Sequence, residues 1–152
     1  MRRAILRISP SAKHSAAPGG SGRLTVDPDG IKRFAAEFDP QLFHLDEATA
    51  RETRFKGLAA SGWHTAAITM RLLVDSEFKP VGGVIGAHVE LDWPLPVRPG
   101  DVLRVESEVL EIRPSRSRSD QGLMRLRTTT FNQNDEAVQI MTSTVVVPRR
   151  PA

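Results

Sequence analysis

The hydrophobic pattern of the chain changes its period near Pro80, and this change constrains the fold more than any other feature. Before Pro80, apolar residues recur with the spacing of one helix face, at Ala59, Trp63, Ala66, Ala67, Met70, Leu73 and Val74. After Pro80, apolar residues alternate with polar ones, as in strands with one buried face. Helices followed by a run of antiparallel strands predict an α+β fold.

The second half of the chain predicts four strands, near residues 85–93, 103–109, 126–131 and 138–146. In the last of them the alternating positions are Val138, Ile140, Thr142, Thr144 and Val146. The polar cluster at 132–135 predicts a turn, and the arginine- and serine-rich segment 113–119 a loop. The helix at 59–74 is apolar enough to be central, so we expect the sheet to curl around it.

Two shorter helices are expected before the central one. Asp27 and Pro28 suit an N-cap and a first helical position, so a helix should begin there. It should end near Glu37, because the following Asp39-Pro40 pair cannot continue it. Its inner face is expected to hold Ile31, Phe34 and Ala35. A second short helix is expected over 46–53, with an aspartate as its cap.

The positive charge of the chain is concentrated at its N-terminus. Of 21 basic residues, five lie in residues 1–26, which contain no acidic residue. Residues 27–152 contain 16 basic and 18 acidic residues, so this part of the chain is close to neutral. It contains no basic stripe with interleaved aromatic residues. We therefore expect no nucleic-acid partner.

Residues 1–24 are expected to form a flexible basic tail, and residues 25–150 a single domain. Within the tail, the composition of 11–22 is typical of a linker. The tail itself has three interpretations: an organellar transit peptide, a plain extension, or a first strand at residues 4–8 on the sheet edge.

Composition also limits the setting of the protein. No apolar run approaches the roughly 20 residues that span a membrane, so no membrane partner is expected. The absence of cysteine excludes disulfides and thiolate metal sites and is compatible with a reducing compartment. We expect a cytoplasmic protein, or an organellar one if the tail is a transit peptide.

Asp39 and His44 are the residues most suggestive of chemistry. A carboxylate and an imidazole that meet in one pocket can hold a water molecule and move its protons near neutral pH. Further on, the small-residue run 57–62 leads into the central helix, whose first turn offers free N–H groups to a carbonyl oxygen. Together these features predict hydration or dehydration next to a thioester.

These residues resemble the MaoC-like acyl dehydratases, which include the (R)-specific enoyl-CoA hydratases and have the hotdog fold. Asp39, His44 and Ala50 have the spacing of the family pattern, and segment 96–101 resembles the family's turn into a long strand. The resemblance covers roughly residues 25 to 148. It implies an antiparallel sheet curled around one long helix.

The chain departs from the family pattern at three positions between the aspartate and the histidine. Gln41 stands where asparagine is usual, Leu42 where proline is usual, and Phe43 where an aliphatic residue is usual. These departures put the substrate geometry in doubt more than the fold.

The resemblance assigns roles to the site residues. Asp39 and His44 would be catalytic, and the backbone N–H of Gly62 would face the thioester oxygen and stabilise an enolate. A packing glycine is the simpler interpretation of Gly62. Substrate contacts are expected from Gln41, Phe43, Ser61, Trp63 and Arg116.

Two of these assignments have alternatives. Ser61 would line the pocket or simply cap the helix. Arg116 belongs, with Arg113 and Arg118, to a loop that suits coenzyme A phosphates, although a solvated hairpin loop is the plainer interpretation.

Three histidines were considered as metal ligands. The spacing of His44, His64 and His88 matches no ligand signature, and the last two are more typical of structural or surface residues. No metal or other cofactor is expected, and coenzyme A enters only as part of the substrate.

The resemblance thus implies reversible addition of water across the C2–C3 double bond of an enoyl-CoA, giving a 3-hydroxyacyl-CoA in fatty acid metabolism. A homodimer, or a larger assembly of dimers, would cover the open sheet edge. A hotdog thioesterase is one alternative, although residues 57–70 lack the acidic residue usual there. A non-catalytic acyl-CoA-binding subunit is the other.

Overall fold

The computed structural model describes residues 13–15, 22–78 and 80–149. Over these residues the chain forms, in order, β1 (Lys13–Ser15), β2 (Leu24–Thr25), α1 (Pro28–Phe38), α2 (Leu42–Leu45), α3 (Glu47–Arg51), α4 (Gly62–Asp75), β3 (Ile85–Asp92), β4 (Val102–Pro114), β5 (Gln121–Phe131) and β6 (Ala137–Pro148). Long strands follow the helices, as the change of period predicts. Within the described part of the chain, no helix is long and apolar enough to cross a membrane.

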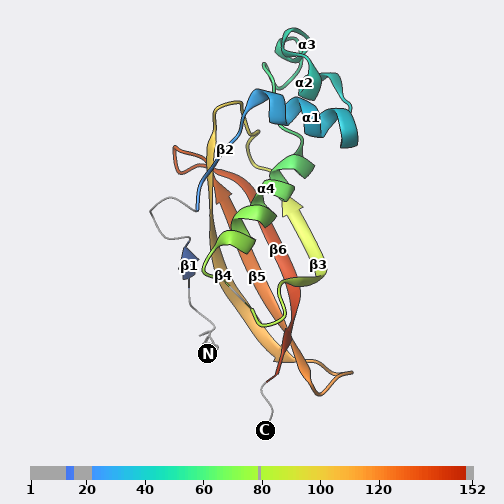
Figure 1. The fold of residues 1–152 in the computed structure, drawn as a ribbon, viewed down its shortest axis with the longest axis vertical. Coiled ribbons are helices and arrows are strands. Elements are labelled where there is room, and N and C mark those ends of the chain that lie inside the picture. The colour runs from blue at the N-terminus through green and yellow to red at the C-terminus, as the bar shows by residue number, and fades with distance from the viewer. Residues whose placement is uncertain (1–12, 16–21, 79, 150–152) are drawn as a thin grey trace.

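The strands form one antiparallel sheet in the order β1-β4-β5-β6-β3, and β2 also pairs with β4. Figure 1 shows α4 lying over β4, β5 and β6, while α1, α2 and α3 gather beyond one end of the sheet. The expected sheet around a central helix is therefore confirmed. The first turn of α4 lies where the small helices meet the sheet.

Side-chain hydrogen bonds cap two of the helices near the site. Asp27 accepts from the Gly30 N–H at 2.8 Å and begins α1, and Asp46 accepts from the Thr49 N–H at 2.7 Å and begins α3. Both caps were predicted, because N-cap chemistry is local. The one-turn helix α2 was not predicted.

The buried face of α4 differs from the predicted one. Its buried residues are Thr65, Ile68, Thr69, Leu72 and Leu73. Of the predicted face only Leu73 is among them, whereas Trp63, Met70 and Val74 are 61%, 41% and 48% exposed. The helix is apolar on more than one side, and only the side facing the sheet is buried within one chain.

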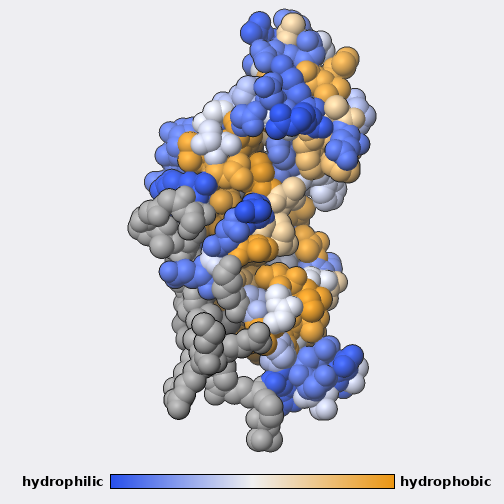
Figure 2. Space-filling view, viewed as in Figure 1, coloured by the Kyte–Doolittle hydropathy of each residue, from blue (hydrophilic) through white to orange (hydrophobic). Residues whose placement is uncertain are grey.

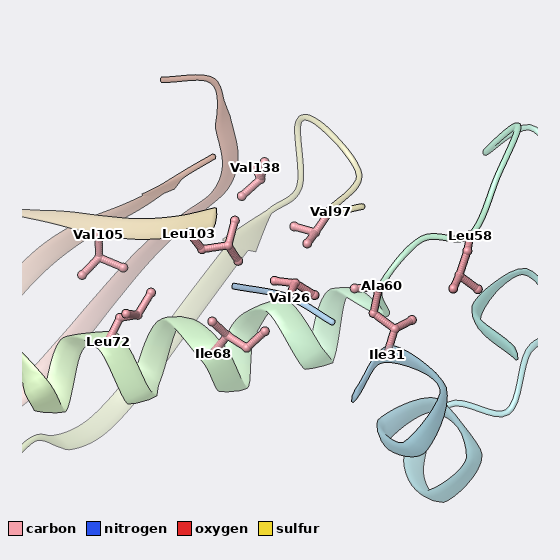
Figure 3. Packing of buried hydrophobic residues seen from close by; sticks show 10 residues of the cluster. All are labelled: Val26, Ile31, Leu58, Ala60, Ile68, Leu72, Val97, Leu103, Val105 and Val138. Atoms are coloured by element: carbon pink, nitrogen blue, oxygen red, sulfur yellow. The ribbon is translucent and has the colours of Figure 1, made fainter. Parts of the chain in front are cut away.

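The core joins the helical end to the sheet. One cluster takes its members from the segment before α1, from α4 and from the strands: Val26, Ile31, Leu58, Ala60, Ile68, Leu72, Val97, Leu103, Val105 and Val138 (Figure 3). A second cluster around Leu73, Met124 and Leu126 fills the other end of α4. Together the two clusters pack α4 against the sheet along its length.

From residue 139 onward, strand β6 buries the face opposite to the one that its apolar alternation predicted. Gln139, Met141, Ser143 and Val145 are buried, and the predicted positions from Ile140 onward are half-buried. The cause is an irregularity in the β5–β6 pairing: Thr130 pairs with Gln139, but Phe131 pairs with Ala137. One extra residue in a strand reverses the side to which later residues point.

The N-terminal segment also differs from expectation. Residues 13–15, predicted as linker within a flexible tail, form β1 and pair with Glu106–Glu108 of β4. Pairing through the backbone needs no apolar side-chain pattern, so composition did not reveal it. The candidate first strand at residues 4–8 lies outside the described residues.

Candidate active site

The carboxylate of Asp39 is held through both of its oxygens. Asp39 follows α1 directly, and its N–H donates to the Ala35 carbonyl at 2.9 Å. The Gln41 amide donates to Oδ1 at 2.6 Å, and the Ser61 hydroxyl donates to Oδ2 at 2.7 Å. Gln41, which stands where the family usually has asparagine, therefore binds this carboxylate.

The imidazole of His44, which α2 carries, is buried and held in one orientation by a hydrogen bond to the backbone outside this helix. Its Nδ1 lies 2.7 Å from the carbonyl oxygen of Ala59. A carbonyl oxygen only accepts, so Nδ1 carries the proton of this hydrogen bond. The other nitrogen, Nε2, then faces Asp39 Oδ2 at 3.3 Å. The structure thus brings together the carboxylate and the imidazole that the sequence singled out.

The surroundings of Asp39 favour its charged form. Burial acts to raise the pKa of this carboxyl, but hydrogen bonds from Ser61 and Gln41, and the charge of the His44 imidazole when that ring is protonated, outweigh burial and hold the pKa below its usual value. Asp39 is therefore a carboxylate at neutral pH. It can accept hydrogen bonds from a bound water molecule.

Aromatic rings limit the space around the imidazole. Phe43 meets the His44 ring edge-on with centroids 4.6 Å apart, and Phe55 lies 6.1 Å from it. Phe43 and Phe55 also contact each other at 5.0 Å. These contacts restrict the ring to the orientation that its Nδ1 hydrogen bond favours.

Gly62 is the first residue of α4 and therefore has no intrahelical partner for its N–H. Ser61 caps this helix by accepting from the Trp63 N–H at 3.2 Å. A Cβ added to Gly62 would lie 2.7 Å from Cε2 of Trp93, so the glycine allows the indole to approach the helix. The packing interpretation of this glycine is supported, and it is compatible with a role for its N–H, which any residue except proline supplies.

A cavity of about 570 Å³ opens beside these groups. Its walls include Asp39, His44 and Gly62, together with three of the expected substrate contacts, Gln41, Phe43 and Trp63. The fourth, Ser61, is fully buried behind Asp39 and acts as both cap and hydrogen-bond donor.

Arg116 is not brought to this cavity. It is exposed in the loop between β4 and β5, at the end of the sheet away from α1, α2 and α3 (Figure 1). Strand β4 has 13 residues, which extend roughly 40 Å and carry the loop that far from the cavity. Within one chain Arg116 therefore does not line this cavity, and its contact with substrate stays a prediction.

Two other arginines line the cavity, and the sequence did not single them out. Arg98 donates to the carbonyl oxygens of Phe55, Gly57 and Leu58, so its guanidinium holds the loop before α4 in place. Arg54 is exposed at the wall of the cavity. No sequence motif marks Arg54, because its place depends on how the loop after α3 folds.

The remaining histidines considered as ligands lie apart from the site. The His64 ring stacks on Phe34 with centroids 4.7 Å apart, and burial lowers its pKa, opposed only in part by the charge of Asp27. His88 lies on the exposed strand β3, 3.3 Å from Glu90. Among the residues that the structure describes, no three His, Cys, Asp or Glu side chains form a group able to hold a metal ion.

An antiparallel sheet curled around one helix, with a site at the first turn of that helix, defines an α+β protein of the hotdog class. The chain belongs to the family of the MaoC-like domain, whose sequence model matches residues 11–131. The family resemblance and the expected fold are thereby confirmed.

Three relatives illustrate this membership. The chain is 52% identical to the MaoC-like dehydratase from Rhodospirillum rubrum, whose crystal structure matches with a TM-score of 0.88 over 95% of this chain and 96% of that one. It is 27% identical to the (R)-hydratase PhaJ1 from Pseudomonas aeruginosa, with a TM-score of 0.70 over 94% and 84% of the two chains. It is also 37% identical over 116 residues to the Bacillus subtilis protein YdeM, covering 76% of this chain and 81% of that one.

Proposed function

We propose that this protein catalyses the reversible addition of water across the C2–C3 double bond of an enoyl-CoA. The observation that carries the proposal is the approach of His44 Nε2 to Asp39 Oδ2 at 3.3 Å, in the wall of a cavity that also contains the first turn of α4. Membership of a family that includes dehydratases and hydratases supports it.

The hydrogen bonds of His44 explain how a water molecule is held. With its proton on Nδ1, the neutral imidazole presents a lone pair on Nε2, and the Asp39 carboxylate presents lone pairs on Oδ2. Two acceptors this close repel each other unless a donor lies between them. A water molecule that donates one O–H to each satisfies both, and its oxygen remains free to attack carbon.

The proposed hydration then needs only proton transfer. The water oxygen bonds to C3 while His44 Nε2 takes its proton, and the electrons of the double bond move toward the thioester oxygen to form an enolate. The proton passes from Nε2 to Asp39 and on to C2, so both groups regain their starting states. Dehydration is the reverse.

The enolate needs a donor at its oxygen, and we propose the N–H of Gly62. This N–H lies at the positive end of the 14-residue helix α4. One such donor is typically worth about 10² to 10³ in rate. The steps require neither a metal ion nor a redox cofactor, and coenzyme A takes part as the carrier of the acyl group.

We propose further that two copies assemble into a homodimer. The outer side of α4 exposes Trp63, Met70 and Val74, and the edge strand β3 exposes Ile85 and Val89. Figure 2 shows hydrophobic residues gathered along the middle of the face that α4 occupies. An apolar face beside an unpaired strand edge is what a second copy would cover.

The decay of the enoyl-thioester absorbance band tests the reaction across a panel of enoyl-CoAs that begins with crotonyl-CoA. Asp39→Asn and His44→Ala should each reduce the rate by about 10² or more. Asp120→Asn is the matched control, because Asp120 also has a lowered pKa but pairs with Arg118 in the distant β4–β5 loop.

Other outcomes would point to other functions. Release of free thiol without loss of the double bond would indicate a thioesterase. Binding of acyl-CoA without turnover, unaffected by His44→Ala, would indicate a non-catalytic subunit. No hydration of any enoyl-CoA by the wild-type protein would contradict the proposal.

A further inference from the structure

Trp93 forms part of the cavity wall at the point where the proposed reaction takes place. It follows β3, and its indole lies against the backbone of Gly62, at the first turn of α4. The Trp63 ring meets it edge-on, with centroids 5.7 Å apart. Two indoles therefore border the same cavity, but they differ in how they are held.

Only Trp93 has its ring nitrogen anchored in the core. Its Nε1–H donates to Oε1 of Gln139 at 2.9 Å, and Nε2 of Gln139 donates to Oγ1 of Thr69 at 2.9 Å. The Thr69 hydroxyl in turn lies 2.6 Å from the hydroxyl of Thr130. Gln139, Thr69 and Thr130 are fully buried, so this chain of hydrogen bonds runs from the cavity wall into the space between α4 and the sheet.

The donors and acceptors of this chain fix the direction of each group. An indole N–H only donates, so the amide oxygen of Gln139 must point to Trp93 and its nitrogen to Thr69. If Trp93 moved away, the amide oxygen would lose its partner in a buried place, which is unfavourable. Trp93 is 42% exposed, but its ring nitrogen is anchored by this bond, so the indole is held in the cavity wall.

We propose that Trp93, anchored by Gln139, is a specificity-determining residue that restricts the site to short acyl chains. The inference rests on the proposed function, because it takes an acyl thioester as the ligand. In this proposal a short acyl group ends at the indole, which lines the same cavity as the imidazole. A longer chain that continued between α4 and the sheet would have to displace the indole and would then meet the amide of Gln139, which an alkyl chain cannot bond.

Binding of saturated acyl-CoAs tests this inference without turnover. The dissociation constants of butyryl-CoA and octanoyl-CoA are measured by calorimetry for the wild-type protein, which should bind butyryl-CoA more tightly. Trp93→Ala removes the wall, so the ratio of the two constants should shift toward octanoyl-CoA by about 10-fold or more, as expected for methylene groups admitted to an apolar pocket. Gln139→Leu should shift the ratio in the same direction, because it frees the indole.

Trp63→Ala is the matched control, since it removes an indole from the same cavity that lacks this anchor. It should shift the ratio much less than Trp93→Ala does, whatever it does to each affinity. An unchanged ratio in Trp93→Ala, or an equal shift in Trp63→Ala, would overturn the inference. Should Gln139→Leu fail to fold, as judged by thermal unfolding, Trp93→Ala decides alone.

Parallel hydration assays separate the two proposals. If the wild-type protein hydrates crotonyl-CoA but Trp93→Ala leaves the binding ratio unchanged, the chain-length inference fails and the proposed function stands. If no enoyl-CoA is hydrated but the ratio of dissociation constants shifts, the proposed hydration reaction fails and the role of Trp93 in chain-length selection stands. If neither acyl-CoA binds to the wild-type protein, both are wrong.

Discussion

Ser61 connects two parts of the site through one hydroxyl group. The oxygen accepts from the Trp63 N–H and so begins α4, and the O–H donates to Asp39 Oδ2. The orientation of the carboxylate and the start of the helix are therefore linked. The buried position of Ser61 excludes water as a replacement donor.

Ser61→Ala should shift the acid limb of the pH profile of kcat/KM to higher pH. Asp39 must be ionised to hold water, and the hydrogen bond from Ser61 helps to lower its pKa, so removing that bond raises the pKa. Activity is lost as the pH falls through this pKa, and the loss should begin at a higher pH in the variant. Asp27→Ala, which removes another helix cap, should reduce stability by about 1 kcal/mol but leave the acid limb in place. An unmoved limb in Ser61→Ala would contradict the assignment.

Two arginines are candidates for binding the coenzyme A phosphates. Arg54 is exposed at the cavity wall, and Arg116 is the candidate that the sequence suggested. We expect Arg54→Ala to raise KM for an enoyl-CoA several-fold, because a guanidinium binds phosphate oxygens. KM for an N-acetylcysteamine thioester, which lacks the phosphates, should change little. Steady-state kinetics of Arg54→Ala and Arg116→Ala on both substrates compare the two residues. A larger effect of Arg116→Ala would place the phosphates at the β4–β5 loop.

At the scale of elements, the site depends on the close approach of the end of β3 to the start of α4. The indole that follows β3 lies where a side chain on Gly62 would be, which is why the helix begins with glycine. Hydrogen bonding from Trp93 to β6 holds the same indole from the other side. Three elements thus position one wall of the cavity.

Gly62→Ala should destabilise the protein by about 1–3 kcal/mol, because the new methyl group would overlap the Trp93 ring. Chemical denaturation measures this loss. In a Trp93→Leu background the same substitution should cost much less, since the two positions are in contact and their effects are not additive. Equal losses in both backgrounds would show that the glycine is required for another reason.

At the scale of the whole molecule, one chain leaves a large apolar surface uncovered. Helix α4 carries exposed apolar residues on its outer side, and β3, which is exposed along both faces, forms the sheet edge beside it (Figure 1). Figure 2 shows that charged and polar residues dominate the two ends of this view, with hydrophobic residues between them. The exposed apolar residues are grouped in one region, and this grouping is the reason for proposing self-association.

Val74→Glu on α4 and Val89→Glu on β3 should each convert the proposed dimer to a monomer, because a carboxylate buried in an apolar interface is costly. Sedimentation velocity measures the change in mass. Ile112→Glu is the control: this residue of β4 is 45% exposed, similar to the 48% and 49% of the two valines. A wild-type protein that sediments as a monomer would contradict the proposal.

Local features of the fold were predictable from the sequence. The change of period near Pro80 predicted the α+β order, and Asp27 and Asp46 were recognised as caps, because each depends on residues close together in the chain. The approach of Asp39 to His44 was expected from the same short segment and from a family resemblance. The roles of these two residues remain predictions until the variants are measured.

Features that depend on distant parts of the chain were not predictable. The buried face of α4 was misassigned because periodicity shows that a helix is apolar but not which side meets the sheet. The face of β6 was misassigned because a pairing irregularity shifted its register. Arg116 lies far from the cavity within one chain because the length of β4 separates its loop from the cavity, and its contact with substrate remains a prediction.

The order of elements, the helix caps and the pair of groups able to handle water can be read from the amino-acid sequence, because they depend on neighbouring residues and on backbone propensity. The boundaries of the cavity depend instead on how the chain packs. Trp93 and Gln139 are 46 residues apart, and Asp39 and Ser61 are 22 apart, yet each pair shares a hydrogen bond. Such bonds form only after packing brings the segments together, and the strand register and the helix face that control this packing are properties of the whole chain.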